Sequence, residues 1–516
     1  MLNKACPLNG GKEGINVNCA SGTEHSKINP VPVYATASAA AWPMYQHDAQ
    51  HTGQSPYVGP STSDIKWTMI GSFAAGTAVG SDGTIYAASG GAYGGNNALA
   101  ITPDGTIKHS FPGVNLCCAS PAIGPGGTVY FSGGGYSPFS IGGTTALNPD
   151  FTLGWNNPMG ICCGSMTIGP DATVYIGDGS VVAVNPANGS TNWTFNPSNG
   201  YLIGQGPAIS HDGGTLYATT ATFLYALSPL TGNVIWSYSI NKFKDSGPVV
   251  GADGTVYVSS GQSIKAVNPD GTLKQDIPLP KYAYTLAVAS DGTIICIAVD
   301  ASDAYTNGTL YALNSDGTQK WSAAVWTGAS VGGAQPIMDA NGKIYIADAT
   351  NDGTLYHCYI VCFDAQGNNL WTYNFPPSPT LMGSPLLSID AQGTLYHEGG
   401  ALYAFAPKSL AIDITLNQTG FTTGQTITAT AHITNDSTPD KVDLKVAVDL
   451  PDGSRVSLGK IDGYNIPANA DITLPPVIYT FNGSEPAGIY KVYGRLLEMK
   501  LGDHLSTDME PFSFNP

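Results

Sequence analysis

Short alternating runs of apolar and polar residues, separated by glycine-containing turns, recur along most of the chain. The repeating unit is a turn followed by a strand that ends in tyrosine, as in ADGTVY. Eight copies occur, seven of which end in tyrosine and one in Ile295: SDGTIY (81–86), PGGTVY (125–130), PDATVY (170–175), DGGTLY (212–217), ADGTVY (252–257), SDGTII (290–295), ANGKIY (340–345) and AQGTLY (391–396). Successive copies are 38 to 51 residues apart, which is the length of a four-stranded propeller blade.

Each unit predicts four strands. A first strand of small apolar residues precedes the turn, as in SPAIGP (120–125), and the second strand ends in tyrosine. The third resembles YALSP (225–229) and the fourth VIWSY (234–238). Small residues suit a first strand that crowds around a common axis, whereas a large ring in the fourth strand can fill the widening space between blades. Six tryptophans lie in predicted fourth strands: Trp67, Trp155, Trp193, Trp236, Trp321 and Trp371.

The two ends of the repeat region complement each other. The segment 65–69 (IKWTM) has the pattern of a fourth strand but precedes every first strand, and the last unit, 384–407, has three strands and no fourth. We therefore expect 65–69 to pair with the last unit and close a ring of eight blades. Closure would remove the free sheet edges that promote aggregation.

The pattern changes after residue 410. Longer alternating runs such as ITATAHIT (427–434) and VDLKVAVDL (442–450) predict half-buried strands separated by polar turns. About 100 residues of this kind are typical of an immunoglobulin-like sandwich. Residues 1–41 show no periodicity and are expected to form an extended arm. The prediction is an all-β fold, an eight-bladed β-propeller over 42–410 followed by an immunoglobulin-like β-sandwich over 411–516.

Composition narrows the classes of partner and compartment. The 516 residues include 20 basic and 37 acidic residues, a net charge of −17, which disfavours nucleic acid because phosphate backbones are also negative. No apolar run reaches the length of about 20 residues needed to span a bilayer. Few lysines, no arginine before Arg455 and adjacent cysteines favour an oxidising environment. We expect a secreted or cell-surface protein, extracellular or periplasmic.

Two segments resemble a known repeat. AVNPANGSTNW (183–193) and ALSPLTGNVIW (226–236) resemble the tryptophan-docking repeat A-x-D-x-x-T-G-x-x-x-W of the quinoprotein dehydrogenase-like propellers, also called the PQQ-like repeat. Asn185 and Ser228 stand where that repeat has Asp. The segment WPMYQHDAQHTGQSP (42–56) resembles the lead-in of such proteins, and we expect its His47 and His51 to have structural roles. The resemblance covers residues 42–407 and indicates a fold more than a chemistry.

The resemblance also implies an enzymatic alternative, a pyrroloquinoline quinone (PQQ)-dependent oxidoreductase. Enzymes of that family hold the quinone tricarboxylate with arginine, bind Ca²⁺ with Glu, Asn and Asp, and use an Asp as base. Here the predicted propeller has no arginine, and its only glutamate is Glu398. Burying three carboxylates without guanidinium partners is costly. We therefore expect no cofactor and assign no catalytic residue, with PQQ and Ca²⁺ kept as the alternative.

Two adjacent cysteine pairs are the most specific candidate site. Cys117–Cys118 and Cys162–Cys163 are 45 residues apart, at equivalent places in consecutive units. The chain there leaves a fourth strand and enters the next first strand, so we expect both pairs near the axis, on the face opposite the Asp-Gly-Thr turns. Structural disulfides are the favoured interpretation. A vicinal disulfide that supports a ligand ring, as the resemblance to methanol dehydrogenases implies, and thiolates that bind a soft metal are the alternatives.

Long predicted loops open on the same face and contain aromatic residues among Gly, Ser and Asn. These are Tyr93, Tyr136, Phe139 and Tyr305. Neutral aromatic and amide surfaces suit protein or carbohydrate contacts. We therefore predict a non-catalytic extracellular binding or assembly protein that recognises a protein partner or another copy of itself, as a subunit of a fibre or surface complex. A quinoprotein oxidoreductase and a carbohydrate-binding or carbohydrate-active propeller are the alternatives.

Overall fold

The computed structural model describes residues 40–516 apart from 72, 74–75, 90–96, 114–119, 134–142, 159–164, 199–205, 242–246, 301–307, 326–328, 331–333, 352–353, 378–385, 407–409, 436–439, 468–469 and 499–503. In this part of the chain the regular structure is β strand, apart from one 3-10 turn at Pro125–Gly127. The predicted all-β class is confirmed. No helix among these residues is long and apolar enough to cross a membrane.

Strands between Ile65 and Phe405 form eight antiparallel sheets within the described residues. Seven of them consist of four strands in the predicted order, and the sheet that contains Ile344–Asn351 has an additional short strand at Ala329–Ser330. The first four sheets along the chain are β2 (Ala78–Val79), β3 (Ile85–Ser89), β4 (Asn97–Ile101), β5 (Ile107–Pro112); β6 (Ala122–Ile123), β7 (Val129–Gly133), β8 (Gly143–Leu147), β9 (Leu153–Asn157); β10 (Met166–Ile168), β11 (Val174–Asp178), β12 (Ser180–Val184), β13 (Thr191–Phe195); and β14 (Ala208–Ile209), β15 (Leu216–Thr219), β16 (Phe223–Leu227), β17 (Val234–Ser239).

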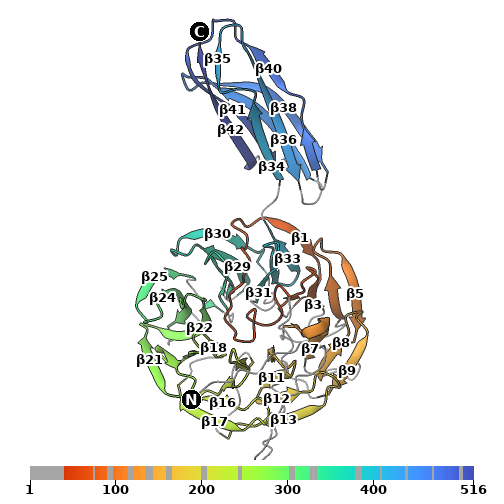
Figure 1. The fold of residues 1–516 in the computed structure, drawn as a ribbon, viewed down its shortest axis with the longest axis vertical. Helices are drawn as coiled ribbons and strands as arrows, with labels where there is room; N and C mark the ends of the chain where they lie inside the picture. Colours follow the sequence, from red (N-terminus) through yellow and green to blue (C-terminus); the bar gives the residue numbers. More distant parts are fainter. Residues whose placement is uncertain are drawn as a thin grey trace, which may run out of the picture. The chain divides into compact units, whose positions relative to one another are not determined.

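The next three sheets are β18 (Val249–Val250), β19 (Val256–Ser259), β20 (Ser263–Val267), β21 (Leu273–Pro278); β22 (Tyr282–Val288), β23 (Ile294–Val299), β24 (Thr309–Leu313), β25 (Gln319–Ala324); and β26 (Ala329–Ser330), β27 (Ile337–Met338), β28 (Ile344–Asn351), β29 (Tyr356–Phe363), β30 (Asn369–Asn374). The last sheet combines β31 (Leu387–Ile389), β32 (Leu395–Glu398) and β33 (Leu402–Phe405) with β1 (Ile65–Met69). Figure 1 shows these sheets arranged around a ring.

The pairing of β1 confirms the predicted connection between the two ends of the repeat region. Trp67 lies opposite Ala404 and Met69 opposite Leu402 in an antiparallel pair with β33. The last sheet is therefore built from two segments more than 300 residues apart in sequence. Loss of β1 from this sheet would expose the edge of β33.

Fourth-strand tryptophans contact the neighbouring sheet, as the pattern predicts. The indole N–H of Trp193 donates to the carbonyl of Pro229 at 2.8 Å, and that of Trp155 to Pro186 at 2.8 Å. The indole of Trp67 donates to Pro103 at 2.9 Å in the same way, which joins the last sheet to the first. Trp236 and Trp321 are further donors of this kind, whereas Trp371 donates to the carbonyl of Pro60, which precedes β1, at 3.4 Å. One repeated contact thus links successive sheets.

The recurring Asp-Gly-Thr sequence has a local cause. In the turn between β2 and β3, the Asp82 carboxylate accepts hydrogen bonds from the Thr84 amide at 3.0 Å and the Thr84 hydroxyl at 2.8 Å. Gly83 between them has a φ of +78°, a conformation that favours glycine. Asp171 and Asp253 hold Thr173 and Thr255 in the same way. These aspartates therefore fix turns, which explains much of the acidic excess.

The strands after residue 410 form two sheets that enclose a second core. One contains β34 (Leu410–Leu416), β36 (Thr426–Asn435), β39 (Ala470–Thr473) and β40 (Val477–Thr480). The other contains β35 (Gly420–Thr422), β42 (His504–Asn515), β41 (Gly488–Glu498), β37 (Asp440–Asp449) and β38 (Arg455–Ile466). Aromatic rings fill one end of this core, where Phe481 stacks on Phe514 with centroids 4.4 Å apart.

Candidate functional site

The centre of the ring is occupied by the chain itself. Residues 42–60, which we call the axial segment, run inside the ring (Figure 1, red). Seven backbone amides of the surrounding sheets donate to carbonyls of this segment at 2.7–3.0 Å. The donors are Val79, Ile123, Ile209, Val250, Val288, Met338 and Ala340. They belong to six sheets, so the segment connects most of the ring through its backbone.

The axial segment follows this path through unusual backbone geometry. Gln46, His47 and His51 have φ values of +52°, +73° and +59°, a region that non-glycine residues seldom adopt. Such residues cost on the order of 1 kcal/mol or more each, so the surrounding contacts must hold them. The sequence contains no direct signal for this geometry, because the segment has neither strand nor helix periodicity.

His51 anchors the segment to a seventh sheet. It is 1 % exposed, and its Nε2 lies 2.9 Å from the hydroxyl of Thr167, which itself lies 2.5 Å from the carbonyl of Pro207. Because a carbonyl can only accept, the Thr167 hydroxyl donates to Pro207 and the imidazole Nε2–H donates to Thr167. Burial lowers the pKa of His51 to about 4, so the neutral ring is the native form. The expected structural role of His51 fits this contact.

A small polar cavity lies beside the axial segment. Gln46 Nε2 donates to Gln335 Oε1 at 3.0 Å, while Gln46 Oε1 and Gln335 Nε2 are buried without a protein partner. Both side chains line a cavity of about 10 Å³ together with Trp42, Thr77 and Ser120. That is about the space of one water molecule, which could satisfy both amides. The cavity is too small for a ligand.

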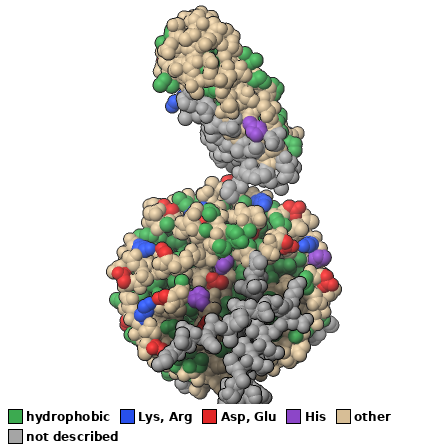
Figure 2. All heavy atoms as spheres, in the orientation of Figure 1, with side chains coloured by type: hydrophobic (Ala, Val, Ile, Leu, Met, Phe, Trp, Pro, Cys, Tyr) green, Lys and Arg blue, Asp and Glu red, His purple; other side chains and the backbone are tan. Residues whose placement is uncertain are grey.

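Two polar side chains of the axial segment, His47 and Asp48, are partly exposed and line a surface depression. His47 Nδ1 lies 3.3 Å from Asp48 Oδ2, and the two side chains are 17 % and 26 % exposed. They line a depression of about 430 Å³ together with His211 and Ser290. Figure 2 shows histidine and carboxylate side chains at the middle of the visible propeller face. Burial alone would raise the pKa of Asp48, but hydrogen bonds from His47 and Thr52 hold it below its usual value.

The residues described around this depression provide a hydrogen-bonded His–Asp pair but no catalytic set. The Asp48 carboxylate is already bound by the backbone amides of Gln50 at 3.1 Å and Thr52 at 3.0 Å. It therefore fixes the turn of the axial segment. Among the described residues, no three His, Cys, Asp or Glu side chains are grouped closely enough to hold a metal ion.

The described residues do not fit the quinone implied by the resemblance. Residues 42–410 contain no arginine, and six of the described lysines of this region form ion pairs with aspartates. These pairs are Lys108–Asp82, Lys265–Asp276, Lys274–Asp253, Lys281–Asp300, Lys320–Asp291 and Lys343–Asp339. A tricarboxylate at the axis would meet the axial segment instead of cationic partners.

The predicted ligand-binding residues all lie outside the described part of the chain. This applies to Cys117, Cys118, Cys162, Cys163, Tyr93, Tyr136, Phe139 and Tyr305. The remaining described cysteines, Cys296, Cys358 and Cys362, are buried thiols within their sheets. Burial raises the pKa of both Cys296 and Cys362 to about 12, which makes these thiols unreactive. The predicted cysteine-bearing face therefore remains a prediction.

Comparison with known proteins identifies the repeat. Residues 177–423 match the family model described as outer membrane protein assembly factor BamB. One similar solved structure is BamB from Moraxella catarrhalis, which is 15 % identical in sequence and has a TM-score of 0.34. The match covers 57 % of this chain and 94 % of that chain. Another is the extracellular domain of the putative hybrid two component system BT4673 from B. thetaiotaomicron, which is 10 % identical and has a TM-score of 0.38. This match covers 88 % of this chain and 69 % of that chain.

None of the curated proteins compared with the chain matches it. The family model covers just under half of the 516 residues, and it falls on the region in which the turn-and-strand unit and the docked tryptophans recur. The sheet order and the family match agree: the chain contains a β-propeller built from PQQ-like repeats.

Proposed function

We propose that this protein is a non-catalytic binding or assembly protein whose propeller is the recognition element. The observation that carries the proposal is the axial segment, which bonds to the inner strands of six sheets. The chain itself thus occupies the place where a propeller enzyme would hold a cofactor and substrate. The outer faces of the ring are then the surfaces available for recognition, and a rigid ring holds their loops in fixed positions.

The finer architecture belongs to the same proposal. We infer that the eight sheets are the blades of one propeller over residues 42–410, and that residues 411–516 form an immunoglobulin-like sandwich. Both inferences are supported by the sheet orders, which keep 65–405 and 410–515 in separate sheets. Residues 1–41 would act as an extended arm that contacts a neighbouring subunit.

We propose that the partner is a protein, or a second copy of this chain in a fibre or surface complex, met outside the cytoplasm. An assembly role is also what the name of the matched family, outer membrane protein assembly factor, states for its own members. The proposed contact face is the one bearing the cysteine pairs and the loops with Tyr93, Tyr136 and Tyr305. Carbohydrate recognition by those aromatic residues is the second alternative, and specific hits on a glycan array would favour it.

Site-specific photocrosslinking tests this proposal. Benzoylphenylalanine placed at Tyr93, Tyr136 or Tyr305 in the full chain, in its native cells, is expected to give covalent adducts of one or a few defined masses. The matched control carries the same group at the exposed turn residue Asn341, in one of the turns predicted to lie on the opposite face. Adducts at none of the tyrosine positions, or equally at Asn341, would contradict the proposal.

Binding of PQQ tests the quinoprotein alternative. When the full chain is mixed with PQQ and Ca²⁺ and passed through a desalting column, we expect the protein fraction to carry no quinone absorption. The reason is the lack of any arginine in residues 42–410 to neutralise three carboxylates. Retention of about one quinone per chain would support the oxidoreductase instead.

A further inference from the structure

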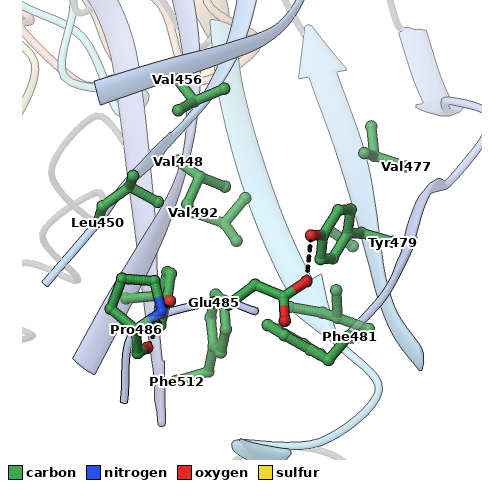
Figure 3. A pocket seen from close by; sticks show the side chains of 13 residues that line it. Val448, Leu450, Val456, Val477, Tyr479, Phe481, Glu485, Pro486, Val492 and Phe512 are labelled. Atoms are coloured by element: carbon green, nitrogen blue, oxygen red, sulfur yellow. Dashed lines mark hydrogen bonds between the residues drawn. The ribbon is translucent and has the colours of Figure 1, made fainter. Parts of the chain in front are cut away.

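The core between the last two sheets contains an apolar pocket, here called the sandwich pocket. Its volume is about 270 Å³. Both sheets contribute walls: Ala429 and Val477 from β36 and β40, and Val448 and Val492 from β37 and β41. Figure 3 shows these strands on either side, with Phe481 and Phe512 at the base of the view. An engineered cavity of about 150 Å³ already accepts benzene, so the sandwich pocket has room for a larger molecule.

The sandwich pocket is open to solvent rather than sealed. Val456 and Tyr479, on the edge strands β38 and β40, line it and are each 45 % exposed. Apolar walls that remain in contact with water are unfavourable, by roughly 25 cal/mol for each Å² that a ligand could cover. The volume of this open apolar pocket is close to the lower end of the range found for small-molecule binding sites.

One charged group lies among these apolar walls. The Glu485 carboxylate accepts hydrogen bonds from the Tyr479 hydroxyl (Figure 3) and from the backbone amides of Asn482 at 3.2 Å and Gly483 at 2.9 Å. The bond from Tyr479 contributes most to lowering the pKa of Glu485, so the carboxylate is ionised at neutral pH. The Asn482 amide lies 3.2 Å from each of the two carboxylate oxygens, so a ligand would meet Glu485 chiefly as a negative charge.

The pocket lining contains no lysine, arginine or histidine among the described residues. A ligand that enters therefore meets an apolar interior and a single negative charge. A carboxylate or phosphate on the ligand would be repelled by Glu485, whereas a cation would be attracted. The neutral hydroxyl of Tyr479 is already used as a donor to Glu485, so it does not compensate an anionic ligand.

We infer that the sandwich pocket binds a small organic cation, with an apolar body of about one aromatic ring and a short alkyl chain in the pocket and an amine head group at Glu485. This inference does not depend on the proposed function, because the pocket lies within the last two sheets and the proposed recognition face lies on the propeller.

Two ligands of equal size and opposite charge test the inference: 4-phenylbutylamine and 4-phenylbutyrate. Titration calorimetry of the full chain is expected to show saturable binding of the amine, at least about tenfold tighter than the acid, which corresponds to about 1.4 kcal/mol. Glu485→Gln keeps the size of the side chain and is expected to reduce this preference to about twofold or less. Its contact with Tyr479 can persist through the amide oxygen.

Filling the pocket gives an independent test. Ala429→Phe is expected to abolish binding of the amine, while Ile489→Ser, at a residue that is 65 % exposed and does not line the pocket, is expected to leave it unchanged. If Ala429→Phe does not fold, the test rests on whether Glu485→Gln loses the preference for the amine over the acid. No saturable binding of the amine to the unaltered chain, equal binding of amine and acid, or full binding by folded Ala429→Phe would each overturn the inference.

Discussion

Replacing Gly232 with alanine is expected to destabilise the propeller by about 2–5 kcal/mol. Gly232 has a φ of +71°, and an added Cβ would lie 2.5 Å from Cε3 of the Trp193 ring. The backbone conformation alone costs an alanine roughly 1–2 kcal/mol, and forcing atoms into a packed contact adds roughly 1–3 kcal/mol. The ring cannot move away freely, because its N–H is bonded to the carbonyl of Pro229.

A matched glycine separates the two costs. Gly126 has a similar φ of +81°, but nothing lies within 4 Å of its added Cβ. Gly126→Ala is therefore expected to cost only the backbone term, about 1–2 kcal/mol. Urea unfolding followed by tryptophan fluorescence measures both variants. Equal losses in the two variants would show that the tryptophan contact adds nothing, and that the ring moves without cost.

The sheets were largely predictable because each of their signals is local and repeated. A turn aspartate that holds a threonine two residues later, as in Asp82 and Thr84, recurs in four of the eight turn-and-strand units. The tryptophan contact likewise needs a ring and a glycine at fixed places in neighbouring units. Even the distant pairing of β1 with β33 followed from counting, because one strand was left over at the start and one was missing at the end.

The axial segment was not predictable in the same way. Its carbonyls bond to six different sheets, and backbone hydrogen bonds of this kind depend on position and not on side-chain type. No period appears in residues 42–60, since each residue meets a different neighbour. Only the resemblance of the lead-in signalled that His51 had a structural role. The cavity between Gln46 and Gln335 joins residues 289 positions apart, and neither side chain marks it in the sequence.

The sandwich pocket was not predictable for a third reason. Val448 and Val492 follow the ordinary inward alternation of a strand, and the sequence pattern predicts them to be core residues. Whether such residues touch across the core or leave a gap depends on how the two sheets are spaced, which alternation does not encode. Glu485 follows a polar turn and carries no sequence signal for its place beside apolar walls.

Two buried histidines, His51 in the axial segment and His397 in β32, also make stability depend on pH. Lowering the pH from 7 to 4 is expected to reduce the free energy of unfolding by about 6 kcal/mol through these two buried histidines. Burial lowers the pKa of His51 and of His397 from about 6.5 to about 4 in the folded chain. Each shift corresponds to about 3 kcal/mol. Between pH 6.5 and 4 the unfolded chain binds protons that the folded chain excludes, so stability falls as the pH falls through this window.

Below about pH 4 the folded histidines also become protonated, and their contribution to the loss is complete. The turn aspartates act in a separate, lower range. Their pKa values are lowered in the folded chain, as for Asp82 and Asp253, so their stabilising contribution is lost only as the pH falls below the ordinary aspartate value of about 4. A loss that begins near pH 6.5 is therefore assigned to the histidines.

Urea unfolding of three proteins across pH 4–7 tests this assignment. His51→Gln is expected to be less stable than the unaltered chain at pH 7, but to lose about 3 kcal/mol less between pH 7 and 4. Thr167→Val removes the hydrogen-bond partner of His51 and keeps the imidazole buried. It is expected to lower stability at every pH while retaining the full dependence. If His51→Gln retained the same dependence as the unaltered chain, the axial histidine would not be the group that titrates, and the segment would owe its stability to backbone bonds alone.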